Sequence, residues 1–256
     1  MSTTTSPAPD STLLDAAPTE PALSIATMND WWALTRRYPE FRLESHSLLK
    51  DFGYMQLMGY FDALAPERAL EMGHGFNATF LRHAQKRCEL HAIDNDQGLV
   101  YFPSGEQWND LYAEHIAAPC REAKLHRGLL GVDGGHDLEP DSFDMIASVS
   151  VLEELDTATL NAVVADAARL LRQGGALVGS FDLILNRPRM LEKLVAACDA
   201  AGLDIPRAPG PISAAKWNDV LIESPSVVML TYQMGQREHR TYSGHWGAAW
   251  FVAIKR

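Results

Sequence analysis

The sequence predicts an α/β protein with a Rossmann-like, doubly wound, mostly parallel sheet of seven strands. The last strand is expected to be antiparallel, and helices on both faces complete three αβα layers. Apolar runs of strand length alternate with segments of helical periodicity, which favours parallel βαβ units. A glycine turn joins the first such run to a helix, as in a nucleotide-binding unit. Two β-rich runs close the chain, which is typical of an antiparallel pair added to a parallel sheet.

The composition limits the class of protein. With 256 residues, of which 46% are hydrophobic and 21% charged, the chain suits one soluble α/β domain with embellishments. The formal net charge of −11 argues against a nucleic-acid partner, because a phosphate backbone requires a basic face. No apolar stretch approaches the roughly 20 residues of a membrane helix, so we expect no membrane partner. The three cysteines, Cys88, Cys120 and Cys198, lie far apart, which indicates a reducing cytoplasm.

The chain divides into three parts. Residues 1–25 are rich in Ser, Thr, Pro and Ala and are expected to form a disordered tail. Residues 26–64 are expected to form an N-terminal helical segment that serves as a possible lid. Residues 65–256 then form the main domain, and no internal repeat is visible.

The N-terminal segment contains two expected helices. Asn29-Asp30 offers capping side chains to a short helix that includes Trp31 and Trp32, and Leu48–Leu64 has apolar residues close to helical spacing. The two tryptophans leave two interpretations open. They form a lid or wall of a substrate pocket, or they pin the first helix onto the domain.

A glycine loop follows the second helix and organises the domain. Ala69–Met72 is an apolar run that stops at the turn Gly73-His74-Gly75, and Asn77 provides a capping side chain for a helix over Ala78–Gln85. A second apolar run, Leu90–Ile93, ends on Asp94. Glycines let the backbone turn sharply and let a ligand approach the main chain, and an acid at a strand tip can accept both hydroxyls of a ribose.

The region after Asp94 is longer than a minimal connection. We expect an insertion or a mobile flap over Asn95–Arg127, with a turn at Phe102–Gly105 and a helix over Trp108–Ile116. One further helix is expected to begin at a cap, Asp156 or Thr157, and to stop at Gln173-Gly174-Gly175. Another helix is expected over Met190–Ala200, with Gly202 just past its end. The remaining strands are expected at Lys124–Leu130, Phe143–Ser148, Ala176–Phe181, Val227–Gln233 and Trp246–Ile254.

Four segments, in order, resemble the motifs of class I S-adenosylmethionine-dependent methyltransferases of the methyltransferase type 11 kind. They are Leu70-Glu71-Met72-Gly73-His74-Gly75, Ala92-Ile93-Asp94, the fourth-strand segment Ser142–Glu153, and Arg169-Leu170-Leu171-Arg172-Gln173-Gly174-Gly175. The resemblance covers about residues 65–255. It implies methyl transfer from S-adenosylmethionine to a small organic molecule by in-line displacement.

The resemblance also implies a cofactor site. Its residues would be Glu71, Gly73, His74, Gly75, Asp94, Asn95 and Ser148. Glu71 would organise the amino-acid end of the cofactor through the loop, and the backbone at the two glycines would pass close to the methionine moiety. Asp94 would hold the ribose hydroxyls with Asn95 flanking the adenosine, and the Ser148 backbone would line the site.

The chain departs from the family's pattern at several points. Asn77 stands where many members have a third glycine, and Gln173 replaces the usual proline. Glu154 follows Glu153 where many relatives have histidine. The acid often found near the adenine is replaced by Leu129-Leu130-Gly131, and Asp133 could serve only from a shifted loop.

Catalytic residues are less legible, because a sulfonium already carries an activated methyl group and needs mainly positioning. A base, if the acceptor needs one, would come from Glu153 after the fourth strand or from His245 in the closing run, although a structural role competes for each. The histidines show no zinc-like spacing, so we expect no metal site.

Two other functions remain open from the residues. A non-catalytic binding or regulatory protein could keep this fold. A nicotinamide-dependent oxidoreductase is less favoured, because Phe76, Asn77 and Ala78 follow Gly75 and the full dinucleotide glycine pattern is absent. The oligomeric state and the methyl acceptor are not determined by the sequence.

Overall fold

The computed structural model describes residues 19–39, 48–95, 105–184, 190–206, 231–234 and 244–256. Its strands are β1 Ala22–Ile25, β2 Arg68–Met72, β3 Glu89–Asp94, β4 Lys124–Arg127, β5 Phe143–Val149, β6 Leu171–Ile184, β7 Leu203–Asp204, β8 Thr231–Met234 and β9 Gly244–Lys255. Its helices are α1 Met28–Arg37, α2 Leu48–Leu64, α3 Thr79–Ala84, α4 Gly105–Tyr112, the π-helical turn η2 Ala113–Ala117, the 3-10 turn η3 Leu152–Glu154, α5 Thr157–Leu170 and α6 Met190–Ala200.

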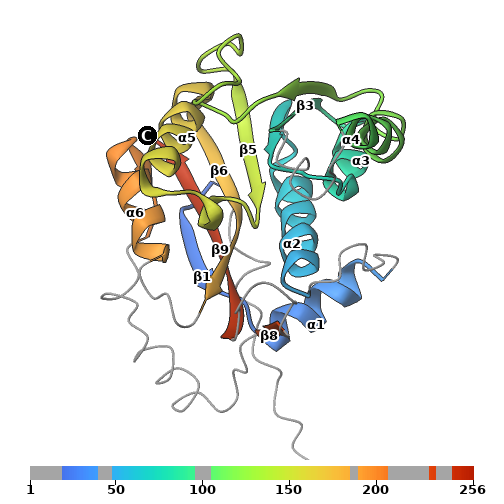
Figure 1. The fold of residues 1–256 in the computed structure, drawn as a ribbon. Helices are drawn as coiled ribbons and strands as arrows, with labels where there is room; N and C mark the ends of the chain where they lie inside the picture. Colours follow the sequence, from blue (N-terminus) through green and yellow to red (C-terminus); the bar gives the residue numbers. More distant parts are fainter. Residues whose placement is uncertain (1–18, 40–47, 96–104, 185–189, 207–230, 235–243) are drawn as a thin grey trace, which may run out of the picture.

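The main path of the sheet has seven strands in the order β1-β9-β6-β5-β2-β3-β4, and the short strands β7 and β8 also pair with β9. Strands β2 to β6 pair in parallel with their neighbours. Strand β9 is antiparallel to β6, β1, β7 and β8. The predicted Rossmann-like, doubly wound and mostly parallel sheet with an antiparallel last strand is therefore confirmed (Figure 1).

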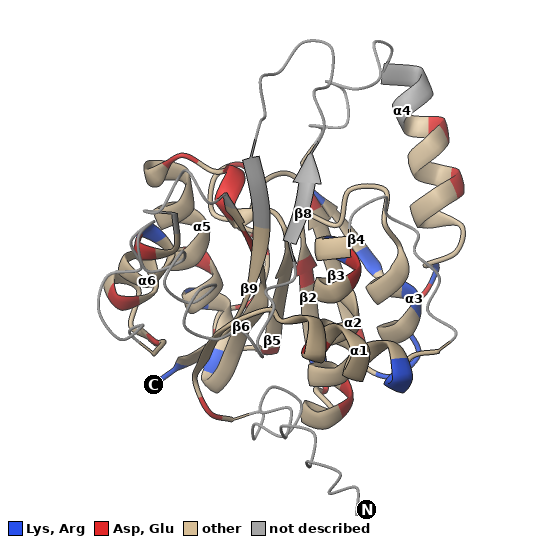
Figure 2. Ribbon diagram, turned by 90° about the horizontal axis from the view of Figure 1, so that it is seen from below, with Lys and Arg blue, Asp and Glu red and all other residues tan. Residues whose placement is uncertain are grey.

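Helices cover both faces of the sheet, which gives the three predicted layers. Helices α1, α2 and α3 lie on one face, and α5 and α6 lie on the other (Figure 2). Side chains alternate along β9, so that Trp250 and Val252 enter the core under α2 while Phe251 and Ala253 enter the core under α5 and α6. Each face of the sheet thus has its own hydrophobic core.

Helix α2 lies deep in the protein, and both of its ends match the prediction. It packs against β5, β6 and β9, and nearly every residue from Leu49 to Gly59 is buried. At Gly53 a side chain would overlap the Ser180 hydroxyl of β6, so glycine allows the helix to approach the sheet closely. This approach brings the first turn of α2 to the edge of the sheet where the parallel strands end.

The N-terminal part differs from the prediction in two respects. Ala22–Ile25, placed in the expected tail of residues 1–25, forms strand β1 because its backbone pairs with β9. Thr27, rather than Asn29, caps α1: its Oγ1 accepts the Asp30 N–H at 3.2 Å, and Asp30 Oδ2 accepts the Thr27 N–H at 2.9 Å. Residues 1–18 lie outside the described part of the chain.

Other element boundaries also differ from the predictions. Helix α3 begins at Thr79, because Asn77 Oδ1 accepts the Thr79 N–H at 2.9 Å before the helix starts. Helix α5 is capped by Asp156 as expected but ends at Leu170, since β6 already begins at Leu171. The expected third strand ends at Arg127, because Gly128 turns the chain with a φ of 120°.

Hydrogen bonds to Asp144 fix the sheet at the edge where the parallel strands begin. Asp144 Oδ2 accepts the backbone N–H groups of Glu67 and Arg68 at 2.8 Å each, and its other oxygen accepts Arg172 Nε. These hydrogen bonds hold the pKa of the Asp144 carboxyl below its usual range despite partial burial. Asp144 therefore has a structural role near the start of β5. Among the described residues, none of the helices combines the length and apolar character needed to cross a bilayer.

Candidate functional site

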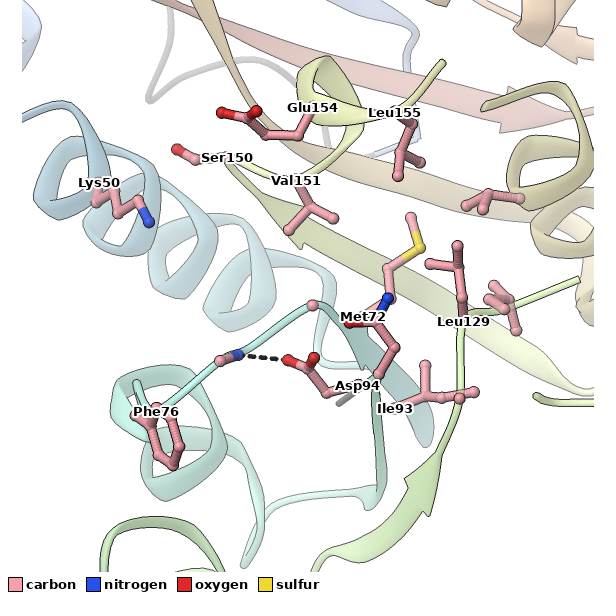
Figure 3. A pocket seen from close by; sticks show the side chains of 16 residues that line it. Lys50, Met72, Phe76, Ile93, Asp94, Leu129, Ser150, Val151, Glu154 and Leu155 are labelled. Carbon is pink, nitrogen blue, oxygen red and sulfur yellow. Dashed lines mark hydrogen bonds between the residues drawn. The ribbon is translucent and has the colours of Figure 1, made fainter. Parts of the chain in front are cut away.

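A cavity of about 540 Å³ opens at the carboxyl ends of the parallel strands. This is the edge at which open α/β sheets bind ligands, and the volume lies within the usual range for small-molecule pockets. Its lining comes from the loops after β2, β3, β4 and β5, from the turn η3, and from the first turn of α2 (Figure 3). The lining is mostly apolar, with a few polar groups at defined positions.

The glycine loop after β2 forms the floor of the cavity. Gly73 and Gly75 both have left-handed backbone conformations, with φ of 73° and 57°. A side chain at Gly73 would overlap Val151, whereas a Cβ at Gly75 would have no atom within 4 Å. The main chain at Gly75 is therefore exposed to the cavity, as a backbone that contacts a ligand must be.

Asp94 stands at the rim, at the tip of β3. Its Oδ2 accepts the backbone N–H of Gly75 at 2.5 Å, and its side chain remains 15% exposed to the cavity. Asn95, the next residue, also lines the cavity. The predicted neighbours Gly73, Gly75, Asp94 and Asn95 are thus brought together around one space.

One side of the cavity is an apolar wall. Ile93, Leu129, Leu130 and Val163 line it. Leu155 lies above Ile93 and Leu129 (Figure 3). Leu129 and Leu130 belong to the segment that is predicted from the sequence to stand where the resembled family often has an acid. Asp133 does not line the cavity, because its Oδ1 accepts the Leu129 N–H at 2.6 Å and closes the turn. This side can hold a flat apolar ring between aliphatic side chains.

The opposite side of the cavity is polar. Lys50 of α2, Ser150 after β5 and Glu154 of η3 line it (Figure 3). Ser150 has a φ of 53°, a left-handed conformation that is costly for a residue other than glycine. Its Oγ donates a hydrogen bond to Asp182 Oδ1 at 3.0 Å. Backbone strain of this kind is concentrated at functional sites, which makes Ser150 a candidate functional residue.

Glu71 lies beneath the glycine loop rather than in the cavity. It is 1% exposed, and neither carboxyl oxygen has a hydrogen-bond partner of good geometry among the described residues. Burial, and secondarily the Asp94 charge, raise the pKa of Glu71 well above its usual value, and the nearby Tyr54 hydroxyl opposes this rise. Burial therefore favours the neutral form of this carboxyl.

His74, inside the loop, is also buried. Its Nδ1 donates to the Gly75 carbonyl at 2.8 Å, and its ring packs 5.9 Å from that of Tyr112. Burial lowers the pKa of His74, although the Asp94 charge opposes this shift. A neutral imidazole thus supports the loop from behind, and it does not line the cavity.

Two of the remaining predicted site residues, Ser148 and Glu153, do not line the cavity. Ser148 is fully buried within β5, and Ser150, two residues later, lines the space in its place. Glu153 points back into the protein, where its Oε1 accepts the Asp182 N–H at 3.1 Å. His245 pairs with Gln233 through the backbone of β9 and β8, and its side chain is outside the described residues.

Lys50, Ser150 and Val151 are lining residues that sequence reasoning did not identify. Ser150 and Val151 directly follow β5, so the rule that ligands bind at carboxyl ends could have found them. No local sequence pattern points to Lys50 as a site residue, because only the packing of α2 brings it to this edge of the sheet. Among the described residues, no group of three potential metal ligands is found.

Comparisons with known proteins support the fold. No protein-family profile matches the sequence, and no curated protein matches it significantly. Among solved structures, a TehB-like S-adenosylmethionine-dependent methyltransferase from Corynebacterium glutamicum is 14% identical, with a TM-score of 0.50 over 89% of this chain and 99% of that one. A putative sarcosine dimethylglycine methyltransferase from Galdieria sulphuraria is 12% identical, with a TM-score of 0.49 over 89% and 98% of the two chains. At these identities the likeness shows a class I methyltransferase fold, as the motifs predicted, and nothing finer.

Proposed function

We propose that this protein binds S-adenosylmethionine and transfers its methyl group to a small organic molecule. The observation that carries the proposal is the relation between Gly75 and Asp94. The glycine exposes its main chain to the cavity, and the carboxylate beside it stands at the cavity rim. A nucleoside needs this pair: open backbone on one side and a hydroxyl acceptor on the other.

The residues around the cavity fit each part of the cofactor. The apolar wall of Ile93, Leu129 and Val163 would hold the adenine, and Asp94 would accept hydrogen bonds from the ribose hydroxyls. The methionine moiety would pass over Gly75 toward the polar side of the cavity. Glu71, buried beneath the glycine loop, would stabilise the positively charged amino end through the loop.

Adenine recognition in this proposal depends on shape. Leucines stand at 129 and 130 and Asp133 is turned to the backbone, so the described acids that line the cavity are Asp94 and Glu154. An apolar wall binds a flat ring mainly by removing apolar surface of both from water. Asn95 at the end of β3 is the polar side chain closest in sequence to the ribose-binding position.

Bound S-adenosylmethionine supplies an activated methyl group, so the chain mainly has to orient the acceptor and exclude water. The polar side of the cavity, with Lys50, Ser150 and Glu154, offers the groups that would contact the acceptor. The cavity volume of about 540 Å³ suits a small molecule rather than a polymer. The location that we propose is the cytoplasm.

Calorimetry with the full-length protein tests the cofactor. We expect S-adenosylhomocysteine to bind with a measurable heat and NADH to give none under the same conditions. Binding of NADH alone would replace the proposal with a nicotinamide-dependent oxidoreductase. Absence of binding for both ligands at high protein concentration would favour a non-catalytic protein that kept the fold, which is the second candidate.

A further inference from the structure

We propose that Ser150 and Asp182 form a proton relay for a methyl acceptor whose nucleophilic atom carries a proton, such as a hydroxyl or an amine. The proposal rests on the methyl transfer proposed above and adds the class of acceptor to it. It starts from an arrangement of side chains at the polar side of the cavity, and Asp182 was not among the residues that the sequence singled out.

The hydroxyl of Ser150 is placed between the cavity and a buried carboxylate. It lines the cavity, and its Oγ donates to Asp182 Oδ1 at 3.0 Å. A hydroxyl has one proton to donate and two lone pairs that accept. Because the proton is engaged by Asp182, the lone pairs of Ser150 remain for a donor in the cavity. That is the geometry required to pass a proton from a ligand to the carboxylate.

The surroundings of Asp182 decide which carboxyl is charged. Asp182 is 4% exposed, and burial raises its pKa to about 6, against the opposing effects of the Ser150 hydrogen bond and the Lys50 charge. Glu153 and Glu154 of η3 are the acids that face it. At pH 7 Asp182 is therefore the ionised member that accepts the Ser150 proton.

Glu153, in contrast, favours the neutral state. Burial, followed by the charge of Asp182, raises the pKa of Glu153 well above its usual value. One of its oxygens accepts the Asp182 N–H, and the other is buried without a partner among the described residues. A neutral carboxyl tolerates such a site far better than an anion. Glu153 thus holds Asp182 in place and leaves it as the proton acceptor.

The relay balances atoms and charge. The proton of the acceptor moves to Ser150 Oγ while the hydroxyl proton moves to Asp182 Oδ1. The electron pair left on the acceptor forms the bond to the methyl carbon, and the pair of the breaking carbon–sulfur bond stays on sulfur as a neutral thioether. Ser150 would contact the acceptor directly, whereas Asp182 acts through Ser150 and is a positioning residue that ends with the proton.

The first test needs no acceptor. In the full-length protein labelled with carbon-13 at aspartate carboxyls, the resonance lost in Asp182→Asn is assigned to Asp182. We expect it to titrate near pH 6 and to shift upward by about 1 in Ser150→Ala, since that variant removes a hydrogen bond to the charged form. Titration near the ordinary aspartate value of about 3.9, unaffected by Ser150→Ala, overturns the proposal.

The second test uses a radiolabelled methyl donor with paired probes: a phenol and a secondary amine, against a tertiary amine and a thioether. We expect methylation of the first pair, with kcat rising about tenfold per pH unit below pH 6 and reaching a plateau above it. Ser150→Ala and Asp182→Asn should lower kcat by about 100-fold with little change in KM, and Asp182→Glu should recover part of it. Glu192→Gln, which removes an exposed carboxylate on α6, is the matched control.

Binding of S-adenosylhomocysteine distinguishes a failure of the proposed function from a failure of the proton relay. We expect the wild type, Ser150→Ala and Asp182→Asn to bind it within about threefold of one another, because the relay faces the acceptor rather than the adenosine. Failure of the wild type to bind overturns the proposed function. Normal binding together with methylation of only the proton-free probes, or with unchanged kcat and pH profiles in both variants, overturns the relay alone.

Discussion

Asp94 Oδ2 accepts the backbone N–H of Gly75 at 2.5 Å, which ties the tip of β3 to the glycine loop after β2. One carboxylate therefore shapes the loop and also stands at the cavity rim. Gly73 adds a second link, since its N–H donates to the Ile93 carbonyl at 2.9 Å. The floor and the rim of the cavity form one hydrogen-bonded unit built from two neighbouring parallel strands.

Asp94→Ala should weaken S-adenosylhomocysteine binding by about 1 to 3 kcal/mol, because both the ribose acceptor and the Gly75 hydrogen bond are lost. Asp94→Asn should cost less, since an amide oxygen can still accept the Gly75 N–H. Calorimetry at pH 7.5 measures both, with Glu192→Ala on α6 as the control. Equal affinity of Asp94→Ala and the wild type would show that the Asp94 carboxylate does not contribute to cofactor binding.

Gly75→Ala and Gly174→Ala form a matched pair. Both glycines have a positive φ, of 57° and 77°, and a Cβ at either would have no neighbour within 4 Å. Each variant should lose about 1 to 2 kcal/mol of unfolding free energy from backbone strain, measured by urea denaturation. Only Gly75→Ala should also lose cofactor affinity, because its methyl group would project into the cavity. A similar affinity loss in Gly174→Ala would refute this assignment.

Glu71→Gln should stabilise the ligand-free protein by about 1 kcal/mol at pH 7. The pKa of Glu71 is raised in the folded state. At a pH just above the ordinary glutamate pKa of about 4.5, the unfolded chain has therefore released the Glu71 proton while the folded protein still holds it. The stability contributed by this group is therefore complete below that pH and decreases as the pH rises toward the folded value. Melting temperatures between pH 5 and 8 should fall less steeply in Glu71→Gln than in the wild type.

The control for that experiment is Glu67→Gln, an exposed carboxylate just before β2. It should leave the pH dependence of the melting temperature unchanged. If both variants flatten the curve equally, the buried position of Glu71 is not the cause.

Gly53→Ala should destabilise the protein by about 1 to 3 kcal/mol, because its methyl group would overlap the Ser180 hydroxyl and lie 2.9 Å from Val149 Cγ1. Ser180→Gly in the same chain should restore part of the loss, since it removes the nearest atoms. A double-mutant cycle measured by chemical denaturation gives the coupling. Additive effects would mean that α2 does not approach the sheet as closely as the structure shows.

Most of the fold could be predicted from local sequence. Helix α2 and helix α6 begin and end where apolar periodicity and flanking residues place them. The strands before and after the glycine loop follow from short apolar runs, which have few alternatives in a chain of alternating pattern. The expected N-terminal tail was wrong at β1 because a distant strand supplied the deciding hydrogen bonds: β1 exists only through β9.

The site was only partly predictable. Gly73, Gly75, Asp94 and Asn95 lie within one βαβ unit, so their spacing carries the geometry. Ser148 and Glu153 were expected at the site because they surround the end of β5, but side chains beyond a strand tip point where the following turn directs them. That turn brings Ser150 to the cavity and directs Glu153 to the backbone of Asp182.

The sequence by itself determined the class of fold, the glycine loop and the acid at the tip of β3, because backbone conformation and strand length are set by residues close together in the chain. The tertiary structure decided that Lys50 and Ser150 share one side of a cavity, with the buried Asp182 behind Ser150. These residues lie on a helix and on the ends of two strands about 30 to 130 positions apart, and no local pattern records their meeting. Packing of α2 on the sheet through Gly53 brings Lys50 to this edge, and the parallel pairing of β5 with β6 brings Ser150 and Asp182 together.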